Sequence, residues 1–150
     1  MTTPIWQPGT TLERCNAKSA RTMVEGLGIV FTELGPDFIR GTMPVDARSV
    51  QPMRILHGGA SVALAETLAS VGANCTVDRR TQAVVGQEIN ANHLRPAPEG
   101  ETVEGTARPI HIGSRSQVWG IEIVDSRKRL VCVSRITLAV IPRPAWTHPA

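Results

Sequence analysis

The sequence predicts an α+β domain in which one long helix packs on an antiparallel sheet. The prediction rests on a single long helical pattern and on strand-like segments before and after it, separated by short turns. The chain has 150 residues, 41% of them hydrophobic and 19% charged, which is typical of one globular domain. We therefore expect a single domain over 1–150, with irregular proline-rich arms at about 1–9 and 142–150.

The elements before the long helix are short. Thr10 and Glu13 have the spacing of a capping box, which predicts a helix from about 10 to 20. Residues 27–34 and 38–45 are largely apolar, and a Gly-Pro-Asp sequence separates them. This pattern predicts two strands joined by a turn.

The long helix is predicted over residues 60–75, where apolar positions recur at intervals of three and four. Its residues are mostly small, so it can lie close against a sheet. Four strand-like segments follow, at 83–95, 101–111, 117–124 and 130–141. The last three are separated by short polar turns, which indicates an antiparallel meander.

Composition argues against several classes of function. Aromatic residues make up only 3% of the chain and tyrosine is absent, which disfavours proteins that stack nucleic-acid bases. The net charge of +3 indicates a mild preference for anionic partners without identifying one. The four histidines share no metal-ligand spacing, so we expect neither a metal nor another cofactor.

Cysteine usage and the lack of targeting patterns favour a cytoplasmic protein. Cys15, Cys75 and Cys132 are odd in number and form no Cys-x-x-Cys motif, which is typical of reduced thiols. No segment has the length of apolar sequence that crosses a bilayer, and the N-terminus does not read as a signal peptide.

Reactive side chains concentrate in residues 51–70, and Glu66 is the main candidate. Leucine and alanine flank it, which disfavours the charged carboxylate and can raise its pKa towards the range of a general base. A glutamate on the solvent face of an amphipathic helix explains the sequence equally well. Ser70 lies one helical turn further on, where it could hydrogen-bond to Glu66 or simply fill a tight helix contact.

Gly58 and Gly59 precede this helix, at a point where backbone N–H groups lack intrahelical partners and the helix dipole is positive. Such a terminus can polarise a carbonyl group or stabilise an oxyanion. An ordinary loop-to-helix junction is the commoner reason for a glycine pair. No Gly-x-Ser-x-Gly motif is present, so a serine-hydrolase triad has little support.

Four segments within about residues 27–141 carry a family resemblance: MPVDARSVQP, LHGGASVALAETLASVGA, VVGQEINANHLRPAPEG and HIGSRSQVWGIEIVD. On these segments the chain resembles the hot-dog thioesterases of the PaaI-like family. That family includes enterobactin proofreading and 1,4-dihydroxy-2-naphthoyl-CoA thioesterases. The resemblance implies a hot-dog fold, in which the sheet wraps around one long helix, and hydrolysis of an acyl-CoA or aroyl-CoA thioester.

The resemblance also implies a role for each residue of the motif. Glu66 is the catalytic carboxylate, acting as a general base on water or as a nucleophile that forms a transient anhydride. The backbone N–H of Gly58 holds the thioester oxygen, and the side-chain amide of Gln51 helps to orient it. His57 supports this loop, and Ser70 assists the hydrolytic water.

Coenzyme A is expected, from the same resemblance, to lie against three segments. They contain Val85, Asn92, His93, Leu94, Arg95, Pro109, Ile110, His111, Ile112, Gly113 and Ser114. Residues 111–115 also suit phosphate on physical grounds, because we expect a glycine turn with free N–H groups and an arginine. The substrate is then an acyl-CoA, with a carrier-protein thioester as a second candidate.

Helix geometry predicts an active site shared between two subunits. Gly58 and Glu66 are eight residues apart, which at 1.5 Å per residue separates them by about 12 Å. Attack on a carbonyl needs an approach of roughly 3–3.5 Å, so one chain cannot present both groups to the same carbonyl. Two antiparallel helices about a two-fold axis can. We expect a homodimer as the minimal active unit, and the relatives imply a homotetramer.

Two alternatives remain open at this point. A hot-dog hydratase or dehydratase would act on the same acyl-CoA ligands without releasing free CoA. A non-catalytic acyl-CoA-binding module would keep the CoA contacts but would not need Glu66, so the presence of Glu66, Gln51 and the His-Gly-Gly turn together weighs against it.

Overall fold

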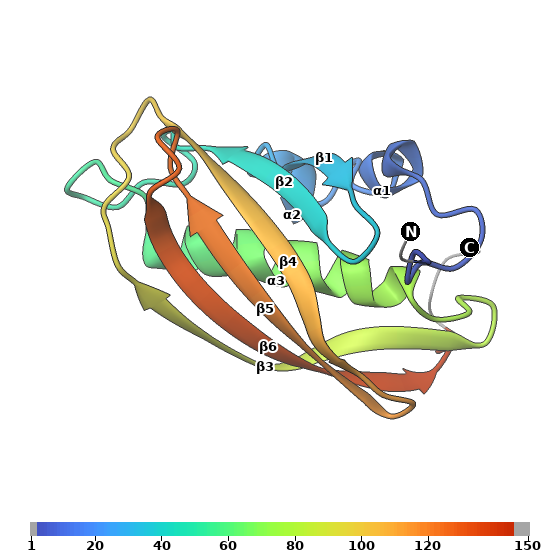
Figure 1. Cartoon of the computed structure of the whole chain (residues 1–150). Helices are drawn as coiled ribbons and strands as arrows, with labels where there is room; N and C mark the ends of the chain where they lie inside the picture. Colours follow the sequence, from blue (N-terminus) through green and yellow to red (C-terminus); the bar gives the residue numbers. More distant parts are fainter. Residues whose placement is uncertain (1–2, 146–150) are drawn as a thin grey trace.

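A computed structural model describes residues 3–145 of the chain (Figure 1). Its elements are α1 (Leu12–Ala17), α2 (Met23–Gly26), β1 (Val30–Leu34), β2 (Ile39–Pro44), α3 (Gly58–Cys75), β3 (Gln82–His93), β4 (Thr102–Ile112), β5 (Ser116–Val124) and β6 (Leu130–Pro142). The strands form one antiparallel sheet in the order β1-β2-β4-β5-β6-β3, and the sheet curves around α3. This is the hot-dog arrangement that the resemblance implied.

The predicted long helix, strands and C-terminal meander are confirmed with small shifts at their ends. The prediction for the first helix is partly wrong. Thr11, not Thr10, is its N-cap and accepts a hydrogen bond from the Arg14 N–H, and the helix ends at Ala17. The sequence pattern does not predict α2, which ends before Gly28, a glycine with a positive φ of 71°.

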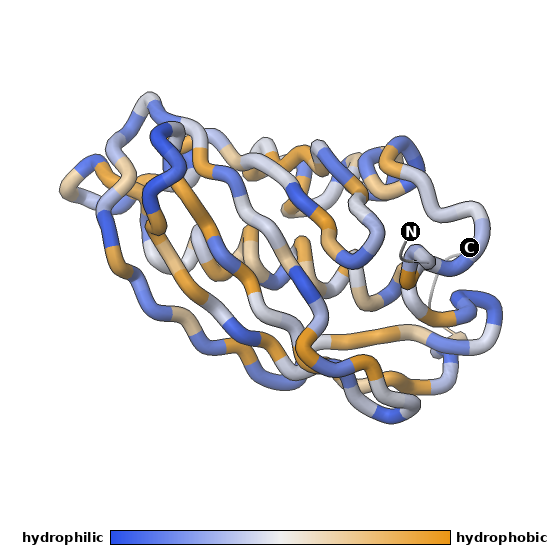
Figure 2. Tube along the Cα trace, viewed as in Figure 1, coloured by the Kyte–Doolittle hydropathy of each residue, from blue (hydrophilic) through white to orange (hydrophobic). Residues whose placement is uncertain are grey.

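The core lies between α3 and the concave face of the sheet. Strand β5 alternates buried and partly exposed residues, as expected for a strand with one face on the core, and Figure 2 shows apolar and polar positions alternating along the strands. Leu64 and Leu68 of α3 are fully buried against this face. A Cβ at Gly105 would lie 2.5 Å from a Leu68 methyl carbon, so glycine in β4 gives the helix room to approach.

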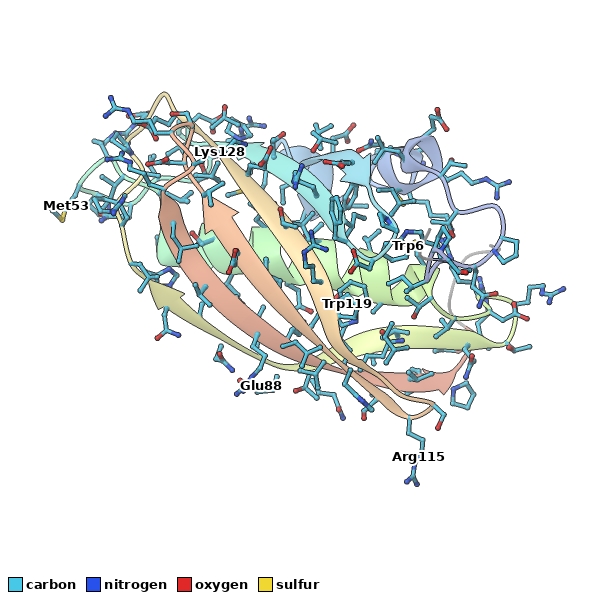
Figure 3. The ribbon with its side chains drawn as sticks, in the orientation of Figure 1. Trp6, Met53, Glu88, Arg115, Trp119 and Lys128 are labelled. Carbon is cyan, nitrogen blue, oxygen red and sulfur yellow. The ribbon has the colours of Figure 1, made fainter. Side chains whose placement is uncertain are left out.

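The N-terminal arm is irregular, as expected, yet it is held firmly to the domain. The Trp6 ring stacks on the fully buried Trp119 with centroids 6.3 Å apart, and its Nε1 donates to the carbonyl of Gly35 at 2.6 Å (Figure 3). The Gln7 N–H donates to the carbonyl of Cys75 at 2.8 Å. Of the predicted C-terminal arm, residues 146–150 lie outside the described residues.

The three cysteines are free and buried. Among residues 3–145, no helix is both long and apolar enough to cross a membrane. The same residues bring together no group of three or more His, Cys, Asp or Glu side chains that could hold a metal ion.

Candidate active site

Helix α3 presents Glu66 on its half-exposed face, towards strand β3. The Ser70 hydroxyl donates a hydrogen bond to Glu66 Oε1 at 3.3 Å, so the contact expected from the one-turn spacing forms. The carboxylate lies against the backbone of Gly86, because a Cβ built there would be 3.3 Å from Glu66 Cδ. Glu66 is therefore fixed between its own helix and the edge strand of the sheet.

The N-terminus of α3 carries an available backbone donor. His57 is the N-cap residue, and its Nδ1 accepts a hydrogen bond from the Gly59 N–H at 2.8 Å. This bond places the proton of a neutral His57 ring on Nε2. Within residues 3–145 the Gly58 N–H has no hydrogen-bond partner, so it points its donor out at the positive end of the helix dipole.

His93 lies beside Gly58, a proximity that the sequence did not reveal. A Cβ at Gly58 would be 2.8 Å from His93 Nε2, so the imidazole covers the glycine at the start of α3. The resemblance assigned His93 only to the CoA-binding segments. The two residues are far apart in the sequence, and the pairing of β3 with β6 brings His93 to the helix N-terminus.

Gln51 lies in the loop before α3 and is half-buried. Its Oε1 accepts a hydrogen bond from the Met53 N–H at 2.6 Å. In the described part of the chain its side-chain NH₂ group has no partner, so this group remains able to donate. No hydrogen bond joins Gln51 to Glu66 or Ser70 within those residues.

An apolar cavity of about 310 Å³ lies against Glu66, between α2 and α3. Its lining residues are Met23, Leu27, Ile29, Gly59, Val62, Ala63, Glu66 and Thr67. Glu66 is the one charged residue among them, so the cavity suits an uncharged apolar group next to a carboxylate. The sequence pattern does not predict the contribution of α2 to this cavity. The one local signal is Thr22, which caps α2 by accepting a hydrogen bond from the Val24 N–H.

A larger cavity, about 700 Å³, lies between the N-terminal arm, α1 and the loop after α3. Its charged residues are Arg14, Lys18, Asp78, Arg79 and Arg80. The single carboxylate among them is paired with Arg80 at 2.8 Å. The lining of this cavity therefore offers no unpaired carboxylate, and the smaller cavity beside Glu66 is the better candidate for chemistry by a carboxylate.

The expected CoA-binding residues fall at two distant places of one chain. Asn92 and His93 end β3 and pair with β6 near Cys132, whereas Ser116 at the β4–β5 turn pairs with Ala139. Seven residues of β6 at about 3.3 Å each separate these positions by roughly 23 Å. Figure 3 shows Arg115 at the β4–β5 turn, at the opposite end of the sheet from the Met53 loop. One chain alone does not gather these segments around one point.

The predicted phosphate-binding turn differs in one respect from expectation. The Gly113 N–H is not free, because it donates to the carbonyl of Ser116 at 2.9 Å and closes the turn between β4 and β5. The N–H groups of Ser114 and Arg115 have no partner within residues 3–145. Two free donors and the Arg115 guanidinium therefore remain at this turn.

Comparison with known proteins identifies the family. The thioesterase superfamily model matches residues 53–132. The proofreading thioesterase EntH of Cronobacter sakazakii is 50% identical over 137 residues, which cover 91% of this chain and 98% of that protein. The 1,4-dihydroxy-2-naphthoyl-CoA hydrolase of Escherichia coli is 52% identical over 138 residues, which cover 91% and 99%.

A solved structure agrees with the sequence relatives. The crystal structure of the thioesterase HI1161 from Haemophilus influenzae matches with a TM-score of 0.89 at 44% sequence identity, over 96% of this chain and 99% of that chain. The sequence relatives and this structure cover most of the chain, and the family model matches its central part, residues 53–132. This chain therefore belongs to the thioesterase superfamily and is a thioester hydrolase.

Proposed function

We propose that the protein hydrolyses an acyl-CoA or aroyl-CoA thioester to a free acid and CoA, with Glu66 as the catalytic carboxylate. The observation that carries the proposal is the position of Glu66 on the wall of an apolar cavity, with its carboxylate hydrogen-bonded to Ser70. The relative from E. coli is named for an aroyl-CoA substrate, which supports CoA as the thiol. Thioesterase relatives favour hydrolysis over hydration and over non-catalytic binding.

Glu66 can act by either of two routes. As a general base it takes a proton from a water molecule, whose oxygen attacks the thioester carbonyl. As a nucleophile it attacks the carbonyl itself and forms an anhydride, which water then opens. In both routes the C–S bond breaks, and the CoA thiolate leaves and takes up a proton. The Ser70 hydroxyl holds the carboxylate or the water in position.

The carbonyl oxygen gains negative charge during this attack and needs donors. The free N–H of Gly58 lies at the positive end of α3, where it can stabilise that charge. The side-chain NH₂ of Gln51 is a second available donor. The role of His57 is to cap the helix and to keep the first turn in place.

In this proposal each active site is shared between two subunits: Gly58 of one subunit and Glu66 of the other act on the same thioester carbonyl. Their separation of about 12 Å along α3 supports this arrangement. The division of the CoA-binding residues between two ends of the sheet supports it independently. We propose a homodimer as the minimal active unit, assembled further into a homotetramer.

A carrier-protein thioester is a second substrate class in this proposal. The three free thiols support action in the cytoplasm.

The test of the catalytic role is the Glu66→Gln variant, assayed with a panel of aryl-CoA, aliphatic acyl-CoA and carrier-protein thioesters and a reagent for the released thiol. Glutamine keeps the shape of the side chain but cannot act as a base or a nucleophile. We expect kcat to fall at least tenfold for the preferred substrate while substrate binding persists. More than a tenth of the wild-type kcat would show that Glu66 is not the catalytic group.

The shared site is tested by subunit mixing. Inactive Glu66→Gln chains are exchanged with inactive Gln51→Ala chains, so that each mixed dimer contains one doubly damaged site and one intact site. Activity should partly return. If exchange is verified by mass spectrometry of differently tagged chains and no activity returns, each site lies within one chain.

A further inference from the structure

Strand β3 passes the Glu66 carboxylate at a glycine. A Cβ built on Gly86 would come well inside 3.0 Å of Glu66 Oε1, and would lie 3.3 Å from Cδ and 3.5 Å from Oε2. Outside its own residue and the two chain neighbours, a Cβ atom in a protein essentially never comes within 3.0 Å of a heavy atom. Any side chain at position 86 would therefore push the carboxylate out of its place.

Neither backbone conformation nor core packing explains this glycine. Among the described glycines, only Gly9, Gly28 and Gly100 have a φ in the left-handed region, and Gly86 does not. Gly86 is also exposed, so no core residue needs the space. Its three nearest neighbours are all atoms of Glu66, so the carboxylate is the group that requires a residue without a side chain.

The local shape of β3 favours the same contact. Gly86 pairs with Leu138 and Glu88 with Thr137, so Gln87 is an extra residue in β3 and forms a bulge directly after Gly86. Bulges bend a strand locally and are common next to active sites. On its other side the carboxylate accepts the hydrogen bond from Ser70. The carboxylate is thus held between a hydroxyl of α3 and the bare backbone of β3.

We propose that Gly86 is a positioning residue. Because it has no side chain, the Glu66 carboxylate can occupy the space beside β3 and is held there relative to the thioester. This inference rests on the proposed catalytic role of Glu66. It adds a second requirement for the site besides Glu66: the residue at position 86 must lack a Cβ.

The first test is the Gly86→Ala variant. Alanine suits the extended backbone at this position, so the new methyl group acts mainly through its clash with the carboxylate. A misplacement of about 1 Å can lower a rate about 100-fold, so we expect kcat to fall tenfold or more. KM should change less than about threefold, because the methyl group is far smaller than the CoA contact surface.

Gly26→Ala is the matched control. Gly26 is exposed in α2, has no positive φ, and a Cβ there would meet no atom within 4 Å. The same chemical change should leave kcat unaltered. An edge strand such as β3 can pair with another chain, so both variants should also be shown to elute as the wild type does in size-exclusion chromatography.

The second test places Gly86→Ala in a Glu66→Ala background, where no carboxylate remains to meet the methyl group. Apart from Glu66, no atom lies closer than 3.5 Å to the Cβ position. The added substitution should then change neither Tm nor the residual kcat, whereas it lowers kcat when Glu66 is present. An equal drop in Tm in both backgrounds would indicate general damage to β3 and would overturn the proposal.

The outcomes separate the two hypotheses. Retained activity in Glu66→Gln overturns the catalytic role of Glu66, whatever Gly86→Ala does. Lost activity in Glu66→Gln together with full kcat in Gly86→Ala overturns the positioning role alone. Lost activity in both, with no effect of Gly86→Ala in the Glu66→Ala background, supports both.

Discussion

Replacement of Gly72 by alanine should destabilise the protein, although alanine is the better helix former. Gly72 is buried on the face of α3 that meets the sheet. A Cβ there would lie 2.9 Å from Cζ3 of Trp119 and 3.1 Å from Cγ2 of Ile39. Alanine in place of glycine stabilises a helix by about 1 kcal/mol. Overpacking a dense core costs about 1–3 kcal/mol, so the sign depends on whether the neighbours can move.

The Trp119 ring is poorly able to move. Its Nε1 donates to Gln117 Oε1 at 2.9 Å, and its face stacks on Trp6. We therefore place the overpacking cost in the upper part of its range and expect a net loss of about 1–2 kcal/mol. For a chain of this size the loss lowers Tm by about 2–8 °C.

The assay is thermal unfolding followed by circular dichroism at one fixed protein concentration, because oligomerisation would make Tm concentration-dependent. Gly26→Ala serves as the comparison, since its methyl group meets no atom and it should be neutral or slightly stabilising. A Tm for Gly72→Ala at or above that of the wild type would refute the packing argument, because the indole would then move at no cost.

Three further predictions concern single side chains. Ser70→Ala should lower kcat less than Glu66→Gln does in the same thiol-release assay, because in the proposed mechanism the hydroxyl orients the reacting groups without performing the chemistry; equal losses would contradict this. Asn74→Ala should lower the free energy of unfolding in urea by about 2–3 kcal/mol, because the amide makes three hydrogen bonds, two of them to β3; an unchanged midpoint would argue against it. Hydrogen bonds from the Arg48 side chain hold the pKa of Asp46 at about 2, below its ordinary 3.8, so the stability that this carboxylate contributes should be present above about pH 4 and lost as pH falls towards 2. Asp46→Asn should remove this part of the stability profile measured by urea unfolding at each pH, and an unaltered profile would show that the pair contributes nothing.

Elements with long repeating patterns could be predicted from the sequence. Helix α3 and strands β4 to β6 follow from hydrophobic periodicity and from the turns between them. Helix α2 could not, because four residues are too few to show a period and its N-cap, Thr22, is followed by no long apolar stripe. Its absence from the prediction also hid Met23 and Leu27 as walls of the cavity.

Some contacts of the candidate site could also be predicted from the sequence, and others could not. The Ser70–Glu66 contact was predictable because both residues lie on one helix, where spacing determines proximity. The contacts of Gly86 with Glu66 and of His93 with Gly58 were not. They depend on the register of β3 against β6 and on a bulge, and no local pattern in the sequence reports either feature.

The strand order has a consequence for how the chain acquires its structure. Strands β4, β5 and β6 pair with their sequence neighbours and can form early, because little loop-closure entropy opposes them. Strand β3 has β6 as its only partner in the described sheet, with β4 and β5 between them in the sequence. During synthesis β3 must therefore wait for β6 before it has a partner. Gly86, which lies against the Glu66 carboxylate, reaches its place only then, so the proposed catalytic glutamate lacks its contact with β3 until the last strand of the sheet has been made.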